Sequence, residues 1–266
     1  MKTSNARKSI FLVSSLLFCT LFAFSGKITT KDIYEIRVYT LKNESQISRL
    51  DNYLKSAFIP AMHRFGVKKI GVFKIVGLDT AHVKKMYVLI PFKSVDQWRS
   101  ANSFLNKDQI FENASNEFTH ADAASPSYER MESIITEAFP GSPNFEIPNL
   151  QTPKSERIYE LRSYESPTEH LFERKVTMFN KGDEIGLFKR LGFNAVFYSS
   201  VISGDRMPNL MYMICFESMT SHDQHWKQFV NDPQWKNIST MPEYENKVSV
   251  SHIDSLLMHA ADYSEI

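Results

Sequence analysis

Cysteine is nearly absent from this 266-residue chain, which has only Cys19 and Cys215. Cys19 lies in a segment that we expect to be removed, so Cys215 would stand alone and no intramolecular disulfide could form. The sequence also has no Gly-rich phosphate loop, no serine nucleophile elbow and no zinc-spaced Cys/His cluster. The commonest motif-bearing enzyme classes therefore lack support, and the sequence predicts no cofactor and no metal site.

The first 25 residues have the pattern of a secretory signal peptide. A basic start, an apolar run and a small-x-small cleavage pattern follow one another: Lys2, Arg7 and Lys8, then residues 10–24, then Ala23-Phe24-Ser25. A membrane anchor would need about 20 apolar residues, and a mitochondrial presequence is disfavoured by the Phe/Leu-rich centre. A lipoprotein signal ending at Cys19 is a weaker variant, because bulky Phe18 precedes the cysteine. We expect export to a periplasmic or extracellular location.

Removal of residues 1–25 takes away three basic and no acidic side chains, which changes the formal charge from +1 to −2. Nucleic-acid binding then has no electrostatic basis. The hydrophobic share of 42% and the charged share of 23% are typical of a water-soluble globule, so we expect no stable membrane span after cleavage. The 20 phenylalanines hint at a pocket, because aromatic side chains often line ligand cavities.

One sequence pattern occurs twice. The segment Tyr34-Glu35-Ile36-Arg37-Val38-Tyr39 recurs 125 positions later as Tyr159-Glu160-Leu161-Arg162-Ser163-Tyr164, and further anchors follow in the same order. Four prolines within fourteen residues separate the two copies. The pattern predicts two modules, residues 33–138 and 157–260, joined by a Pro-rich linker over 139–156.

Each module is predicted to follow the order βαββαβ. In the first module the periodicity predicts strands over 33–41, 71–76 and 85–90, a helix after the first strand that is kinked at Pro60, and a closing strand over about 128–136. Capping boxes, Ser94 with Gln97 and Ser221 with Gln224, are expected to open the second helix of each module. This ferredoxin-like order is α+β and gives a four-stranded antiparallel sheet with one bare face. We expect the two sheets to pair into a pseudo-dimeric α/β barrel.

The two Tyr-Glu-(Ile/Leu)-Arg-x-Tyr strands resemble the NIPSNAP family, a member of the dimeric α/β-barrel superfamily. The stretch from Phe65 to Phe73 and the strand Tyr87-Val88-Leu89-Ile90-Pro91-Phe92 add to the resemblance, which covers both modules. The second module departs from the family pattern at Ser163 and Cys215. The resemblance implies a fold and a barrel cavity, but little about mechanism.

The alternation of side chains along the opening strands gives the candidate ligand-binding residues. We expect three side chains from each opening strand to point into the barrel: Glu35, Arg37 and Tyr39, and Glu160, Arg162 and Tyr164. Buried charges need partners, so each glutamate is expected to pair with an arginine. Two interpretations stay open: the pairs only fix strand register, or they form a polar floor that holds a carboxylate or carbonyl oxygen. No catalytic nucleophile is visible beside them.

Three histidines complete the candidates. His63, at the end of the first helix, is predicted either to cap the helix or to face the cavity, and it joins the candidate ligand-binding residues. His222 and His225 are three residues apart on a predicted helix, a spacing that could hold a metal. A solvated helix face is the simpler interpretation, because the spacing indicates no third ligand.

Three functions remain open from the sequence. The first is an exported protein that binds a small, partly apolar molecule between its sheets. The second is an enzyme like the cofactor-independent monooxygenases or isomerases of the same superfamily, an argument from fold alone. The third is a structural or partner-binding protein. Association of two chains into a homodimer is compatible with each of them.

Overall fold

A computed structural model describes residues 30–78, 80–204 and 206–266 of the chain. The predicted leader, residues 1–25, lies outside these residues. The first half contains four strands and the helices between them: β1 (Ile33–Leu41), α1 (Glu44–Tyr53), the π-helix η1 (Leu54–Phe58), α2 (Ile59–Phe65), β2 (Gly71–Ile75), β3 (Lys84–Phe92), α3 (Val95–Leu105), α4 (Gln109–Thr119) and β4 (Arg130–Ala138).

The second half repeats this order of strands and helical segments. Its elements are β5 (Ile158–Glu165), α5 (Glu169–Asn180), α6 (Glu184–Arg190), β6 (Asn194–Ser203), β7 (Asn209–Phe216), α7 (Met219–Asn231), α8 (Pro233–Ser239), α9 (Asn246–Ser249) and β8 (His252–Ala260). Residues 139–157, between β4 and β5, contain no helix or strand.

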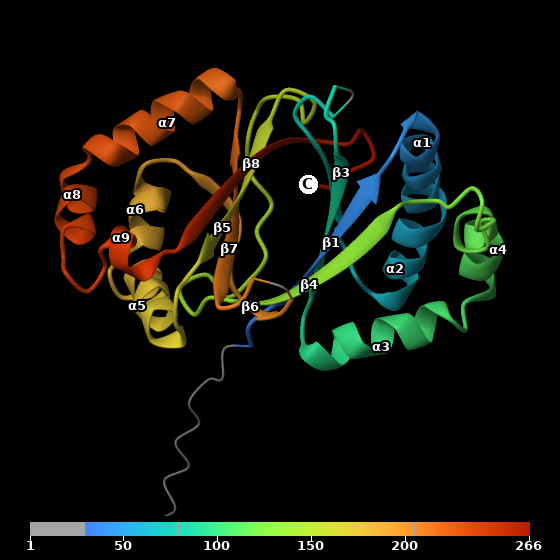
Figure 1. Cartoon of the computed structure of the whole chain (residues 1–266), viewed down its shortest axis with the longest axis horizontal. Helices are drawn as coiled ribbons and strands as arrows, with labels where there is room; N and C mark the ends of the chain where they lie inside the picture. Colours follow the sequence, from blue (N-terminus) through green and yellow to red (C-terminus); the bar gives the residue numbers. More distant parts are fainter. Residues whose placement is uncertain (1–29, 79, 205) are drawn as a thin grey trace, which may run out of the picture.

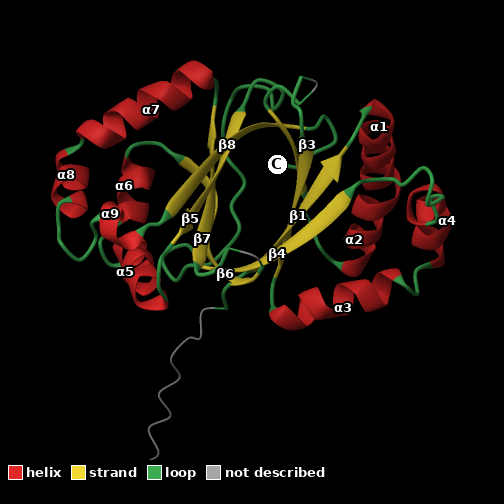
Figure 2. Cartoon of the chain, in the orientation of Figure 1, coloured by secondary structure: helices red, strands yellow, loops and turns green. Residues whose placement is uncertain are grey.

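All eight strands form one closed antiparallel barrel in the order β1-β3-β2-β8-β5-β7-β6-β4. The α+β fold and the pseudo-dimeric barrel predicted from the sequence are therefore confirmed. Hydrogen-bonded edges join the two halves, because Lys74 of β2 pairs with His259 of β8 and Thr136 of β4 pairs with Val201 of β6. The helices of each half lie outside the barrel, on opposite sides (Figures 1 and 2).

The first helical connection shows how proline shapes the chain. Pro60 lacks a backbone donor and its ring crowds the preceding turn, so an ordinary α-helix cannot continue through it without distortion. The wider π-helical turn of η1 accommodates this distortion, and Pro60 lies at the start of α2. Gly66, with a φ of 105°, then ends α2 in the left-handed conformation that favours glycine.

One of the two predicted capping boxes is in its expected place. Ser94 accepts a hydrogen bond from the backbone N–H of Gln97, while Gln97 accepts one from the N–H of Lys93. In the second half the prediction was wrong by three residues. Ser218 is the N-cap of α7 and accepts from the N–H of Ser221, so Ser221 and Gln224 lie inside the helix. The Ser218 side chain satisfies the same free N–H group that Ser94 satisfies in the first half.

Three hydrophobic clusters fill the molecule. One packs β1–β4 against α1–α4, and a second packs β5–β7 against α5–α8. The third lies inside the barrel and draws on both halves, with Tyr34, Ile36 and Val38 from β1 and Tyr159 and Leu161 from β5. The opening strands β1 and β5 are therefore buried on both faces, with one face toward the helices and the other toward the barrel axis.

Candidate functional site

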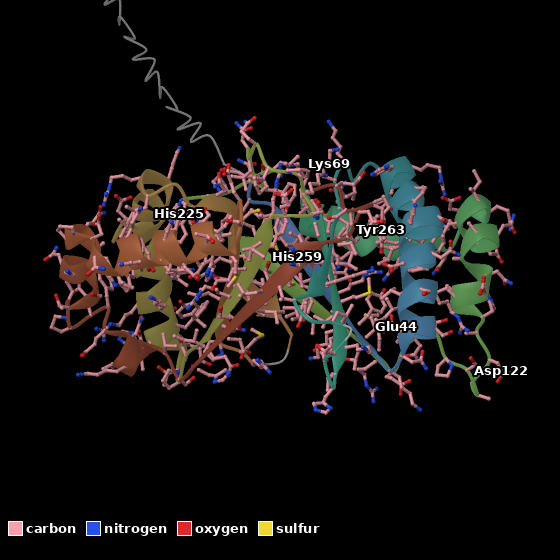
Figure 3. The ribbon with its side chains drawn as sticks, turned by 90° about the horizontal axis from the view of Figure 1, so that it is seen from above. Glu44, Lys69, Asp122, His225, His259 and Tyr263 are labelled. Atoms are coloured by element: carbon pink, nitrogen blue, oxygen red, sulfur yellow. The ribbon has the colours of Figure 1, made fainter. Side chains whose placement is uncertain are left out.

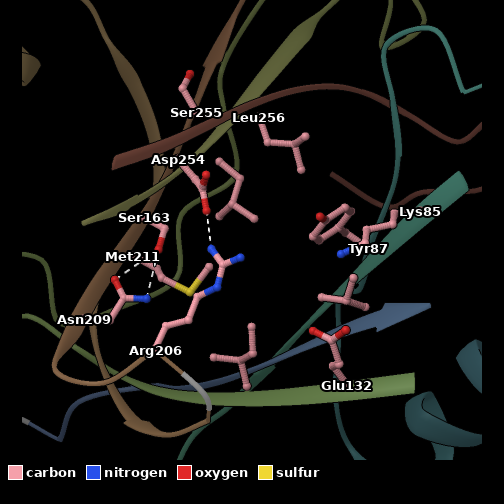
Figure 4. A pocket seen from close by; sticks show the side chains of 13 residues that line it. Lys85, Tyr87, Glu132, Ser163, Arg206, Asn209, Met211, Asp254, Ser255 and Leu256 are labelled. Atoms are coloured by element: carbon pink, nitrogen blue, oxygen red, sulfur yellow. Dashed lines mark hydrogen bonds and ion pairs between the residues drawn. The ribbon is translucent and has the colours of Figure 1, made fainter. Parts of the chain in front are cut away.

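A cavity of about 430 Å³ opens at one end of the barrel (Figure 4). It lies where β1 and β5 end and where β3, β4, β7 and β8 begin. Apolar side chains form much of its surface, and charged side chains stand around them. The lining residues are Val38, Lys85, Tyr87, Glu132, Ile134, Leu161, Ser163, Arg206, Asn209, Met211, Asp254, Ser255 and Leu256.

The opposite end of the barrel interior is filled. Tyr34 packs against Phe197 with a ring-centroid distance of 5.0 Å, and Phe73 packs against Tyr159 at 4.9 Å. Phe145 and Leu150 from the segment between β4 and β5 pack on the same interior cluster, as does the fully buried C-terminal Ile266. The barrel therefore presents one open chamber above an aromatic floor.

The cavity wall contributed by the second half is internally satisfied. Arg206, on the turn between β6 and β7, donates to Asp254 of β8 and lies 3.4 Å from a carboxylate oxygen of Glu165. Ser163 and Asn209 exchange hydrogen bonds of 3.1 Å and 2.9 Å. Dashed lines in Figure 4 mark the Arg206–Asp254 and Ser163–Asn209 contacts. The polar groups of these five residues are thus satisfied within two separate groups, Arg206 with Asp254 and Glu165, and Ser163 with Asn209.

The facing wall has polar groups without partners. The strand register places Val38 of β1 between Tyr87 of β3 and Glu132 of β4, and Lys85 lies two residues before Tyr87 on the same face. Within the described residues, no hydrogen bond or ion pair involves the Lys85 ammonium, the Tyr87 hydroxyl or the Glu132 carboxylate. Figure 4 shows all three side chains pointing into the cavity. Burial, together with the negative charges of Glu132 and Asp254, raises the pKa of Tyr87 to about 12.

The first-half residues predicted to line the barrel interior lie instead on the helix-facing side of β1. Arg37 donates to Glu35 at 2.8 Å and stacks over the Phe58 ring of η1 at 4.8 Å, between the sheet and the helices. Ser133 of β4 also donates to Glu35 at 2.9 Å. Tyr39 belongs to the same helix-facing cluster. Their expected inward direction was wrong, because both strand faces are buried and alternation alone does not tell them apart.

The second-half residues show the same reversal. Glu160 accepts from Arg162 and Ser255 at 2.6 Å each, and from Trp226 of α7 at 2.7 Å. Arg162 also donates to the hydroxyl of Tyr164 at 3.0 Å. The predicted Glu–Arg pairs exist in both halves, but they fasten strands to helices and do not form the floor of the cavity.

The helix layer of the second half also contains a fully buried ion pair. The Lys175 ammonium of α5 lies 3.6 Å from Glu184 of α6, and their side chains are 1% and 4% exposed. Lys175 also donates to Asn246 at 3.0 Å. Burial lowers the pKa of Lys175 and raises the pKa of Glu184, so it disfavours the charged form of each group. Neither residue lines the cavity of the barrel.

The candidate histidines lie away from the cavity. His63 interacts with Glu265 at 3.0 Å on the outer surface, with its side chain 41% exposed. His222 lies 3.2 Å from Glu160, whereas the Nδ1 of His225 lies 2.7 Å from the backbone carbonyl of Ser221. Figure 3 shows His225 in the helical layer of the second half. The two histidines therefore have separate partners and form no shared site.

One cluster of side chains consists of residue types that commonly bind metals. The sequence did not predict this cluster. Glu165, His252 and Asp254 bring their ligand atoms within 4.8 Å of one another at the cavity mouth. Arg206 binds both carboxylates, so a cation would have to displace a guanidinium that already compensates their charge. We assign no metal to this group.

Among the described residues, no helix is long and apolar enough to cross a membrane.

None of the polar residues of the cavity was predicted from the sequence as a ligand-binding residue. Tyr87, Glu132 and Asp254 could have been found from strand alternation, because they face Val38 and Ser163 across the ladders. To use strand alternation in this way, one must first know which faces of β1 and β5 point into the barrel. Arg206 comes from a turn, where alternation gives no information.

Solved structures similar to this one confirm the fold. A protein from Fusobacterium nucleatum subsp. nucleatum ATCC 25586, provisionally named a monooxygenase, matches with a TM-score of 0.57 and 9% identity over 87% of this chain and 93% of that one. A protein from Lactobacillus acidophilus NCFM with the same provisional name matches with a TM-score of 0.53 and 14% identity over 89% and 98%. An anthrone oxidase-like protein matches with a TM-score of 0.51 and 10% identity over 87% and 92%.

Comparison of the sequence itself gives a family match in one half. No curated protein matches the chain. The NIPSNAP family model matches residues 159–265, which begin in β5 and extend past β8. This is the half in which Ser163 and Cys215 depart from the family pattern. The resemblance predicted from the opening strands is thus confirmed for the second half, where the NIPSNAP family model matches.

Proposed function

We propose that this protein binds a small, partly apolar molecule in the open chamber of its barrel. The observation that carries the proposal is the chamber of about 430 Å³, because small-molecule sites typically enclose about 300–1,000 Å³. Its apolar residues, including Val38, Leu161 and Met211, suit the body of such a molecule. The polar residues at its mouth suit one or a few polar groups, a combination typical of ligand sites.

A fluorescent probe tests whether the chamber accepts ligands. N-phenyl-1-naphthylamine is uncharged, and its emission rises in apolar surroundings. We expect saturable binding to the wild type and at least tenfold weaker binding to Leu256→Trp, because Leu256 is half-buried and lines the chamber. Leu257→Trp is the matched control, since residue 257 points to the other strand face. Equal binding by both variants, or no binding by the wild type, would contradict the proposal.

A natural ligand can be sought directly. The purified protein is incubated with a cell extract, washed and examined by mass spectrometry. We expect a small molecule that the wild type retains and that Leu256→Trp loses.

A second candidate function is catalysis of the cofactor-independent monooxygenase or isomerase kind. The Tyr87 hydroxyl and the Glu132 carboxylate both face the chamber without partners, so a bound molecule could exchange a proton with them. The Fusobacterium and Lactobacillus proteins are provisionally named monooxygenases and the third is anthrone oxidase-like, which supports oxidation on the basis of fold alone. Oxygen consumption that disappears in Tyr87→Phe and Glu132→Gln, with folding unchanged, would support catalysis. Arg37 and Arg162 do not test it, because they lie outside the chamber.

Export, a structural or partner-binding role, and homodimer formation also remain proposals. Export rests on the leader pattern of residues 1–25, and N-terminal sequencing of the mature protein tests it: a start near Gly26 is expected. Light scattering of the purified protein measures its oligomeric state directly. A structural role would fit a completely filled barrel better than one with an open chamber.

A further inference from the structure

Two basic and two acidic residues line the chamber, but only one basic and one acidic residue bind each other. Lys85 and Arg206 are basic, and Glu132 and Asp254 are acidic. Arg206 and Asp254 bind each other. Lys85 and Glu132 are both half-buried, and neither is within ion-pair distance of any described residue. One positive and one negative charge therefore face the chamber and are available to a ligand.

Both charges come from the same wall and lie on either side of β1. Glu132 is directly opposite Val38 on β4, and Tyr87 is directly opposite Val38 on β3. Strands in a ladder are about 4.8 Å apart, so about 10 Å separates the backbones of β3 and β4 across β1. Lys85 extends from β3 beside Tyr87 (Figure 4). The polar part of a ligand can thus sit between the two charges, with the apolar part on the residues below.

The charge of the ligand can be inferred from the water that it would displace from Lys85 and Glu132. Lys85 and Glu132 are both partly exposed, so solvent can reach them. A ligand that fills the chamber displaces this water, and an unpaired charge out of water costs free energy. An anion compensates only Lys85, a cation compensates only Glu132, and an uncharged molecule compensates neither. A molecule with one negative and one positive group compensates both.

We propose that the chamber is specific for a zwitterion with an apolar remainder, meaning a molecule with an ammonium and a carboxylate on the same carbon or on neighbouring carbons. This inference rests on the proposed ligand-binding function. The ammonium contacts Glu132 and the carboxylate contacts Lys85. The Tyr87 hydroxyl, on the same strand face as Lys85, donates to the carboxylate, because a phenol is protonated at neutral pH.

Competition against N-phenyl-1-naphthylamine tests the specificity with five compounds that share a phenyl group. Phenylalanine and 3-amino-4-phenylbutanoate are zwitterions with different spacing between their charges. Phenethylamine has only the ammonium, 3-phenylpropionate only the carboxylate, and 3-phenyl-1-propanol neither. We expect at least one zwitterion to displace the probe at about tenfold lower concentration than the other three compounds, since a hydrogen bond to a charged group contributes about tenfold or more in affinity.

Two variants assign the contacts. Lys85→Gln should weaken zwitterion binding about tenfold and leave phenethylamine unchanged. Glu132→Gln should weaken zwitterion binding similarly and leave 3-phenylpropionate unchanged. Lys84→Gln and Glu137→Gln are the controls, because residues 84 and 137 point to the other strand face and their ion partners are Glu44 and Lys31. Circular dichroism confirms that each variant is folded.

The outcomes separate this inference from the proposed function. Probe binding without any preference for either zwitterion would overturn the inference and leave the ligand-binding proposal intact. A preference that survives in both Lys85→Gln and Glu132→Gln would also overturn it. Failure of the probe itself to bind the wild type would contradict the proposed function.

Discussion

The buried ion pair of the second half permits a quantitative test of what its charges contribute. Lys175 lies six residues after the start of α5, where α1 has the fully buried Leu50, and Glu184 begins α6, where α2 begins with Ile59. The same two helix positions thus hold an apolar pair in one half and a charged pair in the other. We predict that Lys175→Leu combined with Glu184→Ile leaves the free energy of unfolding unchanged or raises it by about 1–4 kcal/mol, as replacement of buried ion pairs by apolar pairs commonly does.

The single variants should behave differently. Lys175→Leu leaves the Glu184 carboxyl buried without its cation, and its Oε2 already has no hydrogen-bond partner. We expect a loss of about 3–5 kcal/mol, the usual cost of breaking a buried pair from one side. Glu184→Ile should cost less. The Lys175 ammonium keeps its contact with Asn246 and lies 5.2 Å from the Phe179 ring centroid and 5.4 Å from that of Tyr164.

Urea unfolding at pH 7, followed by far-UV circular dichroism, measures all three variants. Leu50→Met in the first half is the control for a volume-conserving change at the corresponding site, with an expected cost below about 1.5 kcal/mol. A double variant that is more than about 2 kcal/mol less stable than the wild type would refute the reasoning. Such a result would mean that the charged pair, with Asn246, stabilises this layer better than leucine and isoleucine do.

Four further predictions concern other parts of the fold. Ile266→Ala should lower the free energy of unfolding by about 2–4 kcal/mol, because it leaves a cavity in the aromatic floor. Gly71→Ala should also destabilise, since its Cβ would lie 2.5 Å from Cδ1 of Ile266; the double variant should cost less than the sum, and strict additivity in urea unfolding would contradict this contact. Burial raises the pKa of the Cys215 thiol to about 12. In a Cys19→Ser background, Ellman's reagent should therefore fail to label the native protein at pH 8 and should label one thiol in urea. The contribution of the neutral thiol to the free energy of unfolding should be lost as the pH rises from about 9 to 12. Rapid labelling of the native protein would show that the thiol is accessible. Glu160→Gln should destabilise more than Glu35→Gln, because Glu160 accepts from Arg162, Ser255 and Trp226, whereas Glu35 lacks a tryptophan donor; equal losses in thermal unfolding would show that the Trp226 contact contributes nothing.

The sequence predicted the architecture much better than the site. Strand alternation and the recurring Tyr-Glu-x-Arg pattern were sufficient for the barrel, because these signals are local and occur twice. They could not identify the inner face of β1. Tyr34, Ile36 and Val38 suit a helix-covered core as well as a barrel interior, and in this fold both faces are buried.

The direction of the Glu35–Arg37 pair depends on contacts that are distant in sequence. Ser133 lies 98 residues after Glu35, and Phe58 lies on a helix whose position is set by packing. The chamber itself arises because Ile266 and the segment that contains Phe145 fill only one end of the barrel. Neither fact follows from periodicity, so the cavity residues Lys85, Glu132 and Arg206 were missed.

The closure of the barrel within one chain has a consequence for how a guest molecule is oriented. The chamber has Tyr87 beside Val38 on one side, whereas Met211 stands beside Ser163 on the other. A barrel closed by two identical subunits would offer every guest two equivalent poses, related by a half-turn. Here the two sides differ in chemistry, so one pose is lower in free energy, and the same atom of the guest meets the same side chain in every molecule.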